Sequence, residues 1–373
     1  MLLATFHGGP SGVDQVYAYH IKTKELRSTQ ALEQPTPATL SELRSIVVAN
    51  GLLYVTSGGK STSTLLCYRR DSAARPAETS TNDPLFTYVS TVIGPTVSKK
   101  QFTTAIAHPF GVAFATDPVC YVSNQDTNVV AKVDLSSDGQ TGSLGTGCRS
   151  AFLSGLFPSP ATFLDGTFVA SQEGALPDVA ITATSVPATD GGLGLQWATQ
   201  AELAAADSAH KEKLQNSVRD LAVANGFLFV CDEVDHAVNM YSLTNGAFLG
   251  QAPLASKPTH LAIYNGGLYV SAGTTLFWGQ LPTQNAAPTL TQVTLAPPSV
   301  AGKTATLGGI SFDGVTSTAY IPFQVGTGTV GTGAIWTYTV NQSDPSKLPT
   351  LNDAGVFVDA LPDTPEFVCY VPD

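Results

Sequence analysis

The sequence has few charged residues, because Asp, Glu, Lys and Arg together make up only 13% of its 373 positions. Its 18 basic residues form no cluster, and 29 acidic residues bring the formal net charge to −11. An acidic surface without basic patches repels phosphate groups, so we expect binding neither to nucleic acid nor to an anionic membrane. Low charge with abundant Gly, Ser, Thr and Val is typical of short strands joined by tight turns rather than of exposed helices.

Long apolar runs and cysteine motifs are also missing. No stretch approaches the roughly 20 apolar residues of a membrane-spanning helix. The N-terminal MLLATFH lacks the basic region and long apolar core of a secretion signal. We therefore expect a cytoplasmic protein, or a secreted one if a signal peptide has been removed. The five cysteines form no CxxC pair, which argues against a disulfide framework and a zinc site.

One pattern recurs along the chain: an apolar strand, a tight turn, a second strand that ends in an aromatic residue and Val, and a polar loop. A third strand follows each pair, which is the meander of a four-stranded β-propeller blade. Asn-Gly pairs at Asn50, Asn225 and Asn265 supply the left-handed residues that two-residue hairpins require. The repeats include SIVVANGLLYVTSGG from Ser45, GVAFATDPVCYVSNQD from Gly111, DLAVANGFLFVCDEV from Asp220, HLAIYNGGLYVSAGT from His260 and GISFDGVTSTAYIPFQ from Gly309.

The two ends of the sequence complement each other. The C-terminal PEFVCYVPD matches a first strand that lacks its second strand, and the N-terminal MLLATFHGG matches a second strand that lacks its first. We therefore predict a single all-β domain over residues 1–373, a seven-bladed β-propeller closed by pairing of the N- and C-terminal strands. Dividing 373 residues by seven gives about 53 residues a blade.

Two parts of this prediction have alternatives. Residues 150–217 contain only one clear hairpin, so the alternative is six blades with an insertion. One short helix is expected at about 199–215 (TQAELAAADSAHKEKLQ), where Thr199 and Glu202 form a capping box at its start. This helix would either cover a central pocket or decorate the surface.

Candidate catalytic residues lie at the starts of the first strands, which line the axis of a propeller. The positions aligned there are occupied by Ser45, Phe110, Asp220, His260, Gly309 and Glu366. We take His260, Asp220 and Glu366 as the catalytic candidates, because a carboxylate beside an imidazole fixes its tautomer and raises its basicity. The alternative is that these three side chains bind neighbouring blades through hydrogen bonds to backbone amides.

The same mouth is half polar and half apolar, which suits a small organic molecule with one polar end. The candidate substrate-binding residues come from this mouth and from the loops near it: Phe110, Ser45, His7, Asn124, Gln172, Asp232 and Trp197. The loops also hold Gln125, Asp126, Glu173, Glu233 and His236, and oxygen-rich loops of this kind can hold Ca²⁺ or Mg²⁺. Because no ligand spacing is fixed, we predict no metal or other cofactor. Arg44 and Arg219 occupy equivalent positions and are interpreted as ties between blades, with anion binding as the alternative.

Two stretches resemble the repeats of lactonase-like and NHL-like propellers: HPFGVAF followed by YVSNQDTNVVAKVD, and VRDLAVANGFLFVCDEVDHAVNMYSL. The resemblance covers most of the chain and implies a propeller fold. Members of this group include gluconolactonase-like hydrolases, which hold a divalent metal with Glu, Asn and Asp. The corresponding metal set implied here is Glu366, Asn124 and Asp220 or Asp232. Muconate-lactonising enzymes and fungal natural-product cyclases are similar in outline.

The sequence contains no nucleophile motif, so any rate enhancement has to come from positioning, acid–base help and fixed hydrogen bonds. We expect an enzyme that makes or breaks a ring in a small organic substrate: a lactone hydrolase, a lactonising isomerase or a cyclase of natural-product biosynthesis. We expect it to be a monomer. The alternative from another class is a non-catalytic propeller that binds a protein or peptide on its upper loops.

Overall fold

All regular structure described by the computed structural model is β-strand. The predicted helix at 199–215 lies outside the described residues. None of the described segments is a helix long and apolar enough to cross a membrane. The described residues are 1–8, 12–36, 39–58, 63–71, 81–94, 106, 108–116, 118–125, 129–143, 149–150, 164–165, 182–187, 193–196, 218–233, 235–244, 248–295, 299–300, 303–324 and 333–372.

The chain divides into two compact units. The first consists of residues 1–91, 259–280 and 290–373, and the second of residues 92–258 and 281–289. Each unit is built from antiparallel sheets of mostly four strands in sequence order, which is the construction of a propeller blade.

The first unit holds four blades, although the last two residues of one strand (Phe86–Ile93) and the first residue of another (Pro258–Tyr264) belong to the second unit. One joins the last strand to the first three: β31 (Pro365–Tyr370), β1 (Leu2–Phe6), β2 (Tyr17–Tyr19) and β3 (Leu26–Ser28). The next consists of β4 (Leu43–Ala49), β5 (Leu52–Ser57), β6 (Thr64–Arg70) and β7 (Phe86–Ile93). Another consists of β20 (Pro258–Tyr264), β21 (Gly267–Ala272), β22 (Thr275–Gln280) and β23 (Thr291–Val293). The last follows a short hairpin of β24 (Ser299–Val300) and β25 (Lys303–Thr304), and consists of β26 (Thr306–Leu307), β27 (Ser311–Asp313), β28 (Thr318–Gln324), β29 (Gly333–Asn341) and β30 (Thr350–Leu361).

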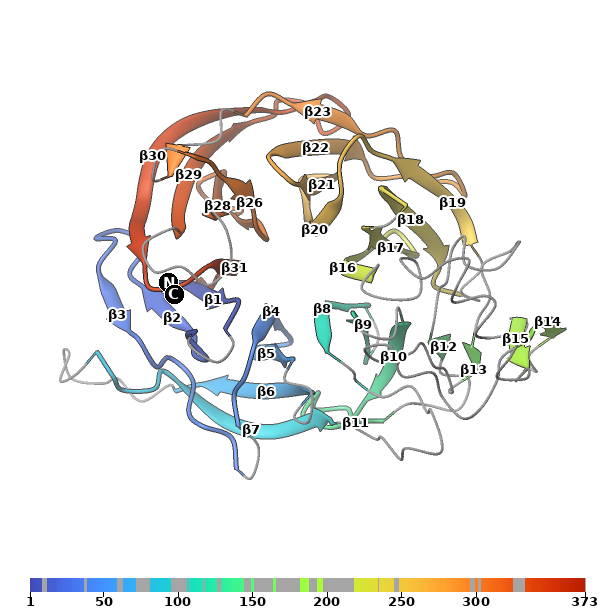
Figure 1. Ribbon diagram of the computed structural model, residues 1–373, viewed down its shortest axis with the longest axis horizontal. Coiled ribbons are helices and arrows are strands. Elements are labelled where there is room, and N and C mark those ends of the chain that lie inside the picture. The colour runs from blue at the N-terminus through green and yellow to red at the C-terminus, as the bar shows by residue number, and fades with distance from the viewer. Residues whose placement is uncertain are drawn as a thin grey trace. The chain divides into compact units, whose positions relative to one another are not determined.

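The predicted pairing of the terminal strands is confirmed. Strand β31 runs antiparallel to β1, with Leu2 opposite Tyr370 and Ala4 opposite Val368. Beyond the strands, the N-terminal ammonium of Met1 donates a hydrogen bond to the carbonyl of Val371 at 2.8 Å. The two ends of the chain accordingly lie side by side in Figure 1. One blade therefore combines the last strand of the sequence with its first three.

The second unit holds two blades. One consists of β8 (Pro109–Phe114), β9 (Val119–Asn124), β10 (Val129–Leu135) and β11 (Gly142–Ser143), and the other of β16 (Val218–Ala224), β17 (Phe227–Asp232), β18 (Ala237–Ser242) and β19 (Phe248–Pro253). Two short pairs lie between them in sequence: β12 (Arg149–Ser150) with β13 (Leu164–Asp165), and β14 (Thr182–Pro187) with β15 (Leu193–Gln196).

The fold is an all-β propeller, but the predicted number of seven blades is not confirmed. The described residues form six blades. The seventh had been assigned to residues 150–217, where only Ser150 of β12 and the short strands β13, β14 and β15 are described. These strands form two-stranded pairs rather than a four-stranded meander, so this part of the chain provides no further described blade.

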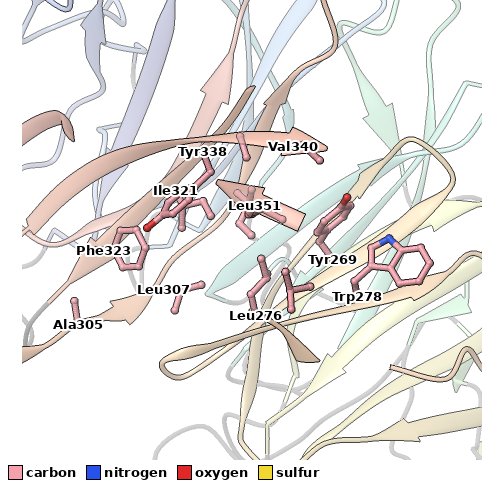
Figure 2. Close-up of a cluster of buried hydrophobic side chains, with 13 residues drawn as sticks. Tyr269, Leu276, Trp278, Ala305, Leu307, Ile321, Phe323, Tyr338, Val340 and Leu351 are labelled. Carbon is pink, nitrogen blue, oxygen red and sulfur yellow. The ribbon is translucent and has the colours of Figure 1, made fainter. Parts of the chain in front are cut away.

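Local turn chemistry accounts for the hairpins within the blades, and apolar packing accounts for the contacts between blades. Asn50, Asn225 and Asn265 all have positive φ, between 45° and 52°, and each is followed by a glycine that also has positive φ, as a two-residue hairpin requires. Apolar side chains of adjacent blades pack face to face. Figure 2 shows one such cluster in the first unit, where Tyr269, Leu276 and Trp278 of one blade meet side chains of the next, among them Leu307, Ile321, Phe323, Tyr338, Val340 and Leu351.

Candidate functional site

Four innermost strands carry the same irregularity close to their first residue. In β4, two residues, Arg44 and Ser45, lie opposite a single residue of β5, Thr56. A bulge of this kind breaks the alternation of side chains along a strand and re-aims them, and bulges are common next to functional sites. The same two-against-one pairing recurs as Phe110–Gly111 against Ser123, Arg219–Asp220 against Cys231, and Glu366–Phe367 against Thr5.

A hydroxyl on the neighbouring strand satisfies the backbone at two of these bulges. The hydroxyl of Ser123 accepts a hydrogen bond from the N–H of Gly111 at 2.8 Å. The hydroxyl of Thr5 accepts one from the N–H of Phe367 at 3.1 Å and donates one to the carbonyl of Arg44 at 2.7 Å. The bulges are therefore fixed parts of the blades, and they position the residues at the strand starts.

In the first unit three titratable or charged side chains lie around Glu366, and one of them, Arg44, stands like Glu366 at a bulge. One carboxylate oxygen of Glu366, Oε2, lies 3.5 Å from Nη1 of Arg44 and 3.4 Å from Nδ1 of His7. The other, Oε1, lies 3.9 Å from Nε2 of His260. The side chains come from β31, β4, the residue after β1 and β20. We call Glu366, Arg44, His7 and His260 the Glu366 cluster.

The members of this cluster differ in exposure. The side chains of Arg44 and His260 are 3% exposed and that of Glu366 is 9% exposed, whereas that of His7 is 39% exposed. His7 is therefore the member that a molecule from solvent meets first, with Glu366, Arg44 and His260 behind it.

The electrostatic balance keeps Glu366 ionised. Burial by itself would raise the pKa of this carboxyl, because a charged group loses its hydration. The guanidinium of Arg44, the contact with His7 and the nearby His260 together outweigh burial and lower the pKa of Glu366 from 4.5 to about 2. At neutral pH Glu366 is thus a permanent anion, and it is a weak base.

Besides Glu366, two neighbours contact the ring of His260. Its Nδ1 lies 3.0 Å from the hydroxyl of Thr259, and its ring meets the edge of the Phe367 ring with centroids 4.6 Å apart at 76°. Phe367 in turn packs on Gly309, where an added Cβ would lie 2.5 Å from Cδ1 of the phenyl ring. The N–H of Gly309 also donates to the carbonyl of Glu366 at 2.8 Å. A glycine at 309 is therefore part of the arrangement that positions both Glu366 and His260.

A backbone carbonyl and one carboxylate anchor the backbone that carries His7. The N–H of His7 donates to the carbonyl of Thr364 at 2.9 Å. Just beyond, Asp363 Oδ2 accepts hydrogen bonds from the N–H groups of Gly8 at 3.2 Å and Val13 at 2.9 Å. His7 therefore projects from a backbone that is bonded on both sides to the segment before β31.

Asp220 and Phe110, like the predicted site residues Asn124 and Asp232, lie in the second unit. Asp220 is buried, and its Oδ1 accepts a hydrogen bond from the N–H of Leu221 at 2.8 Å. An added Cβ at Gly111 would lie 2.3 Å from the same oxygen, so glycine makes room for this carboxylate. The ring of Phe110 is buried and lies 5.7 Å from the guanidinium carbon of Arg219. The pairing of Asp220 with His260 stays a prediction.

The remaining candidates bond within their own blades or lie outside the described part of the chain. The amide of Asn124 donates to the carbonyl of Val122 at 3.1 Å. Asp232 accepts hydrogen bonds from the N–H of Asp235 at 2.9 Å and the amide of Asn239 at 3.2 Å. Ser45 is buried at its bulge. Gln172 and Trp197 lie outside the described residues.

The surroundings of Glu366 disfavour a divalent metal ion at its Oε2. Among the described residues, no three His, Cys, Asp or Glu side chains are grouped so that they could hold one. A guanidinium 3.5 Å from the carboxylate of Glu366 would repel a second cation at that oxygen. The metal set implied by the lactonase resemblance combines Glu366 of the first unit with Asn124 and Asp220 or Asp232 of the second, and it stays a prediction.

Comparison with known proteins supports the fold alone. No protein-family model matches the chain, and no curated protein matches its sequence. Among solved structures, a protein from Lactobacillus plantarum is similar with a TM-score of 0.51 and 11% identity, covering 100% of this chain and 99% of that one. A protein of unknown function from Bacteroides caccae has a TM-score of 0.50 and 10% identity, covering 100% and 98%. A "putative 6-phosphogluconolactonase" from Bacteroides fragilis has a TM-score of 0.49 and 12% identity, covering 100% and 97%.

The shared feature is the propeller. At these identities the likeness shows the fold alone and carries no assignment of function. Any activity has to be argued from the side chains of the site.

Sequence reasoning placed Glu366 near His260 and interpreted Arg44 as a tie between blades, but it did not place Arg44 in the same cluster. The alignment set Glu366 level with Ser45 and Asp220. The strand pairing instead sets it level with Arg44 and Arg219, the first residue of each bulge. The interpretation of Arg44 as a tie is consistent with its contacts to His7 and Glu366, which belong to a different blade. Arg219 forms an ion pair with Glu233 in its own blade.

Proposed function

We propose that the chain is an enzyme that makes or breaks a ring in a small organic substrate, with the Glu366 cluster as its acid–base site. The observation that carries this proposal is the buried, permanently ionised carboxylate of Glu366, placed between a buried guanidinium and two imidazoles. Burying a charged network is costly, and such groups are concentrated at functional sites.

The roles in the cluster follow from pKa and exposure. With a pKa of about 2, Glu366 does not act as the base; it orients the imidazoles and stabilises positive charge that develops on them. His7 is the exposed member and contacts the substrate. His260 lies behind Glu366, with its Nε2 3.9 Å from Oε1, where the carboxylate stabilises positive charge on the imidazole ring.

The state of two buried cysteine thiols supports a reaction without a covalent nucleophile. Burial, and in addition the carboxylates of Asp220 and Asp232, raise the pKa of Cys231 well above its ordinary value. Burial raises the pKa of Cys369 to about 12. A thiol with a raised pKa stays protonated and is a poor nucleophile. The hydroxyl of Thr259, next to His260, lies 3.3 Å from the carbonyl oxygen of Ser271 and donates to it, which suits an orienting role.

The test is turnover of a panel of uncharged γ- and δ-lactones and their hydroxy acids, followed by NMR. We expect His7→Ala and Glu366→Gln each to slow the reaction by roughly 10²- to 10⁴-fold. The double variant should be little slower than the slower single one, because residues acting as a unit are not additive. His20→Ala is the matched control and should leave turnover unchanged; this histidine follows β2, and its Nδ1 accepts a hydrogen bond from the N–H of Thr23. Folded His7 and Glu366 variants with wild-type turnover would refute the site.

A further inference from the structure

The contact between Arg44 and His7 decides which ring nitrogen of His7 carries the proton. Nη1 of Arg44 lies 2.5 Å from Nδ1 of His7 and 3.3 Å from the carbonyl oxygen of the same residue. A guanidinium in a protein stays protonated and can only donate hydrogen bonds. Nδ1 of His7 must therefore supply the lone pair, so the neutral ring carries its proton on Nε2.

Glu366 does not reverse this assignment. Its Oε2 lies 3.4 Å from Nδ1 of His7, and a proton on Nδ1 could be donated to it. That proton would then face an N–H of Arg44, which is the closer of the two neighbours. Arg44 also lies 3.5 Å from the same carboxylate oxygen, so one guanidinium satisfies both Glu366 and His7. With the proton on Nε2, Nη1 of Arg44 donates to Nδ1 of His7 and lies near Oε2 of Glu366, while Nδ1 and Oε2, 3.4 Å apart, are both acceptors that face this guanidinium.

The proton on Nε2 is available to a bound molecule. The side chain of His7 is 39% exposed. Its hydrogen bonds and ion pairs to described residues involve only Nδ1 and the backbone, which leaves Nε2–H for a ligand. The backbone N–H of His7 is fixed on Thr364, which limits how far the ring can shift.

The charge of the cluster restricts the ligand. Arg44 is 3% exposed, and its guanidinium already contacts His7, Glu366 and, through Nη2 at 3.7 Å, the carboxylate of Glu42. The charges of this guanidinium and of the carboxylates of Glu42 and Glu366 add up to −1 when the imidazoles are neutral. An anionic group at His7 would therefore meet a net negative charge and no exposed guanidinium from Arg44.

We infer that His7, held by Arg44 with its proton on Nε2, binds and polarises the carbonyl oxygen of an uncharged substrate such as a lactone, and that phosphorylated compounds are excluded. A preorganised N–H donor aimed at a carbonyl oxygen stabilises the negative charge that develops there during addition to the carbonyl. This inference rests on the proposed function and names the substrate class for the same site.

The tautomer is tested first, without any ligand. Side-chain ¹⁵N spectra of the labelled protein at pH 8, with the His7 signals assigned by their loss in His7→Gln, should show a protonated Nε2 and an unprotonated Nδ1. Arg44→Lys, which keeps one donor and the charge, should retain this pattern. Arg44→Met should shift it toward a mixture of tautomers. A protonated Nδ1 in the wild-type protein would overturn the inference.

The ligand class is tested with two probes. The uncharged lactam δ-valerolactam, which is not readily hydrolysed, should shift the His7 signals and the amide of Gly8, whereas phenyl phosphate should not. His7→Gln, which keeps an N–H donor, should retain lactam binding, and His7→Phe should weaken it about tenfold, as expected for one lost hydrogen bond. Binding of phenyl phosphate at His7, or of neither probe, would overturn the inference. The proposed function would still stand or fall on turnover in the Glu366 variants.

Discussion

The hydroxyl of Thr5 accepts a hydrogen bond from the backbone N–H of Phe367, a residue 362 positions away in the sequence, at 3.1 Å. The same buried hydroxyl donates to the carbonyl of Arg44 at 2.7 Å. It therefore connects β31, β1 and β4, the strands that position Glu366, His7 and Arg44. The candidate site depends in this way on the pairing of the two ends of the chain.

Replacing Thr5 by Val should destabilise the protein. The substitution keeps the shape of the side chain but leaves a buried N–H and a buried carbonyl without their shared partner, which costs about 1–3 kcal/mol in free energy of unfolding. Thr5→Ser retains the hydroxyl and should lose less. Urea denaturation of the two variants and the wild type measures the difference. Equal midpoints for Thr5→Val and the wild type would show that the bridge contributes nothing.

Deletion of residues 365–373 should prevent folding or cause aggregation. The deletion removes β31, which leaves β1 as an exposed sheet edge and removes Glu366 from its cluster. Circular dichroism and light scattering of the truncated chain measure both effects. Deletion of residue 373 alone leaves β31 intact and is the control. A truncated protein that melts at the wild-type temperature would contradict the terminal pairing.

Replacing Gly309 by Ala should destabilise the site by steric overlap. The new Cβ would lie 2.5 Å from Cδ1 and 3.0 Å from Cγ of Phe367, so either this ring or the strand has to move, at about 1–3 kcal/mol. Gly314→Ala is the matched control, because an added Cβ there meets no atom within 4 Å. The aromatic-ring signals of Phe367 and His260 should shift in Gly309→Ala only. Identical melting temperatures for both variants would refute the close packing.

The sequence was sufficient to predict the blades. Each Asn-Gly pair has the positive φ values that a two-residue hairpin requires, so turn chemistry alone located three hairpins. The unmatched strands at the two ends of the sequence predicted that β31 lies beside β1, because a strand without a neighbour needs a partner. The count of seven is not confirmed, because the part of 150–217 that the structure describes forms only two-stranded pairs.

The bulges were not predicted from the sequence. For that reason the set of residues that forms the site was not predicted either. A bulge adds one residue to a strand without changing the apolar pattern on either side, so alignment by hydrophobic residues can slip by one there. Glu366 was consequently matched to Asp220 instead of Arg44. The hydroxyl of Thr5 opposite the bulge is a signal that could have located it, because a polar residue between apolar neighbours in a buried strand needs a backbone partner.

The last prediction concerns the pH dependence of stability. The pKa of Glu366 is about 2 in the folded protein, against an ordinary value of 4.5. Below pH 4.5 the unfolded chain therefore binds a proton at this carboxyl that the folded chain does not bind. The stability that comes from this difference is fully present above pH 4.5 and is lost as pH falls toward 2.

Glu366→Gln should separate this contribution from those of other carboxyls. At pH 7 the variant leaves the buried Arg44 without its carboxylate partner in β31, which costs about 3–5 kcal/mol. Between pH 4.5 and 2 the gap between wild type and variant should narrow, because only the wild type loses the ionised Glu366. Asp359→Asn, at an exposed carboxylate of β30, controls for the change in net charge and should run parallel to the wild type. Melting temperatures measured at half-unit steps from pH 7 to pH 2 give the three curves. If the Glu366→Gln curve also runs parallel to the wild type, the carboxyl is not held ionised by Arg44 and the imidazoles, and the electrostatic basis of the site is wrong.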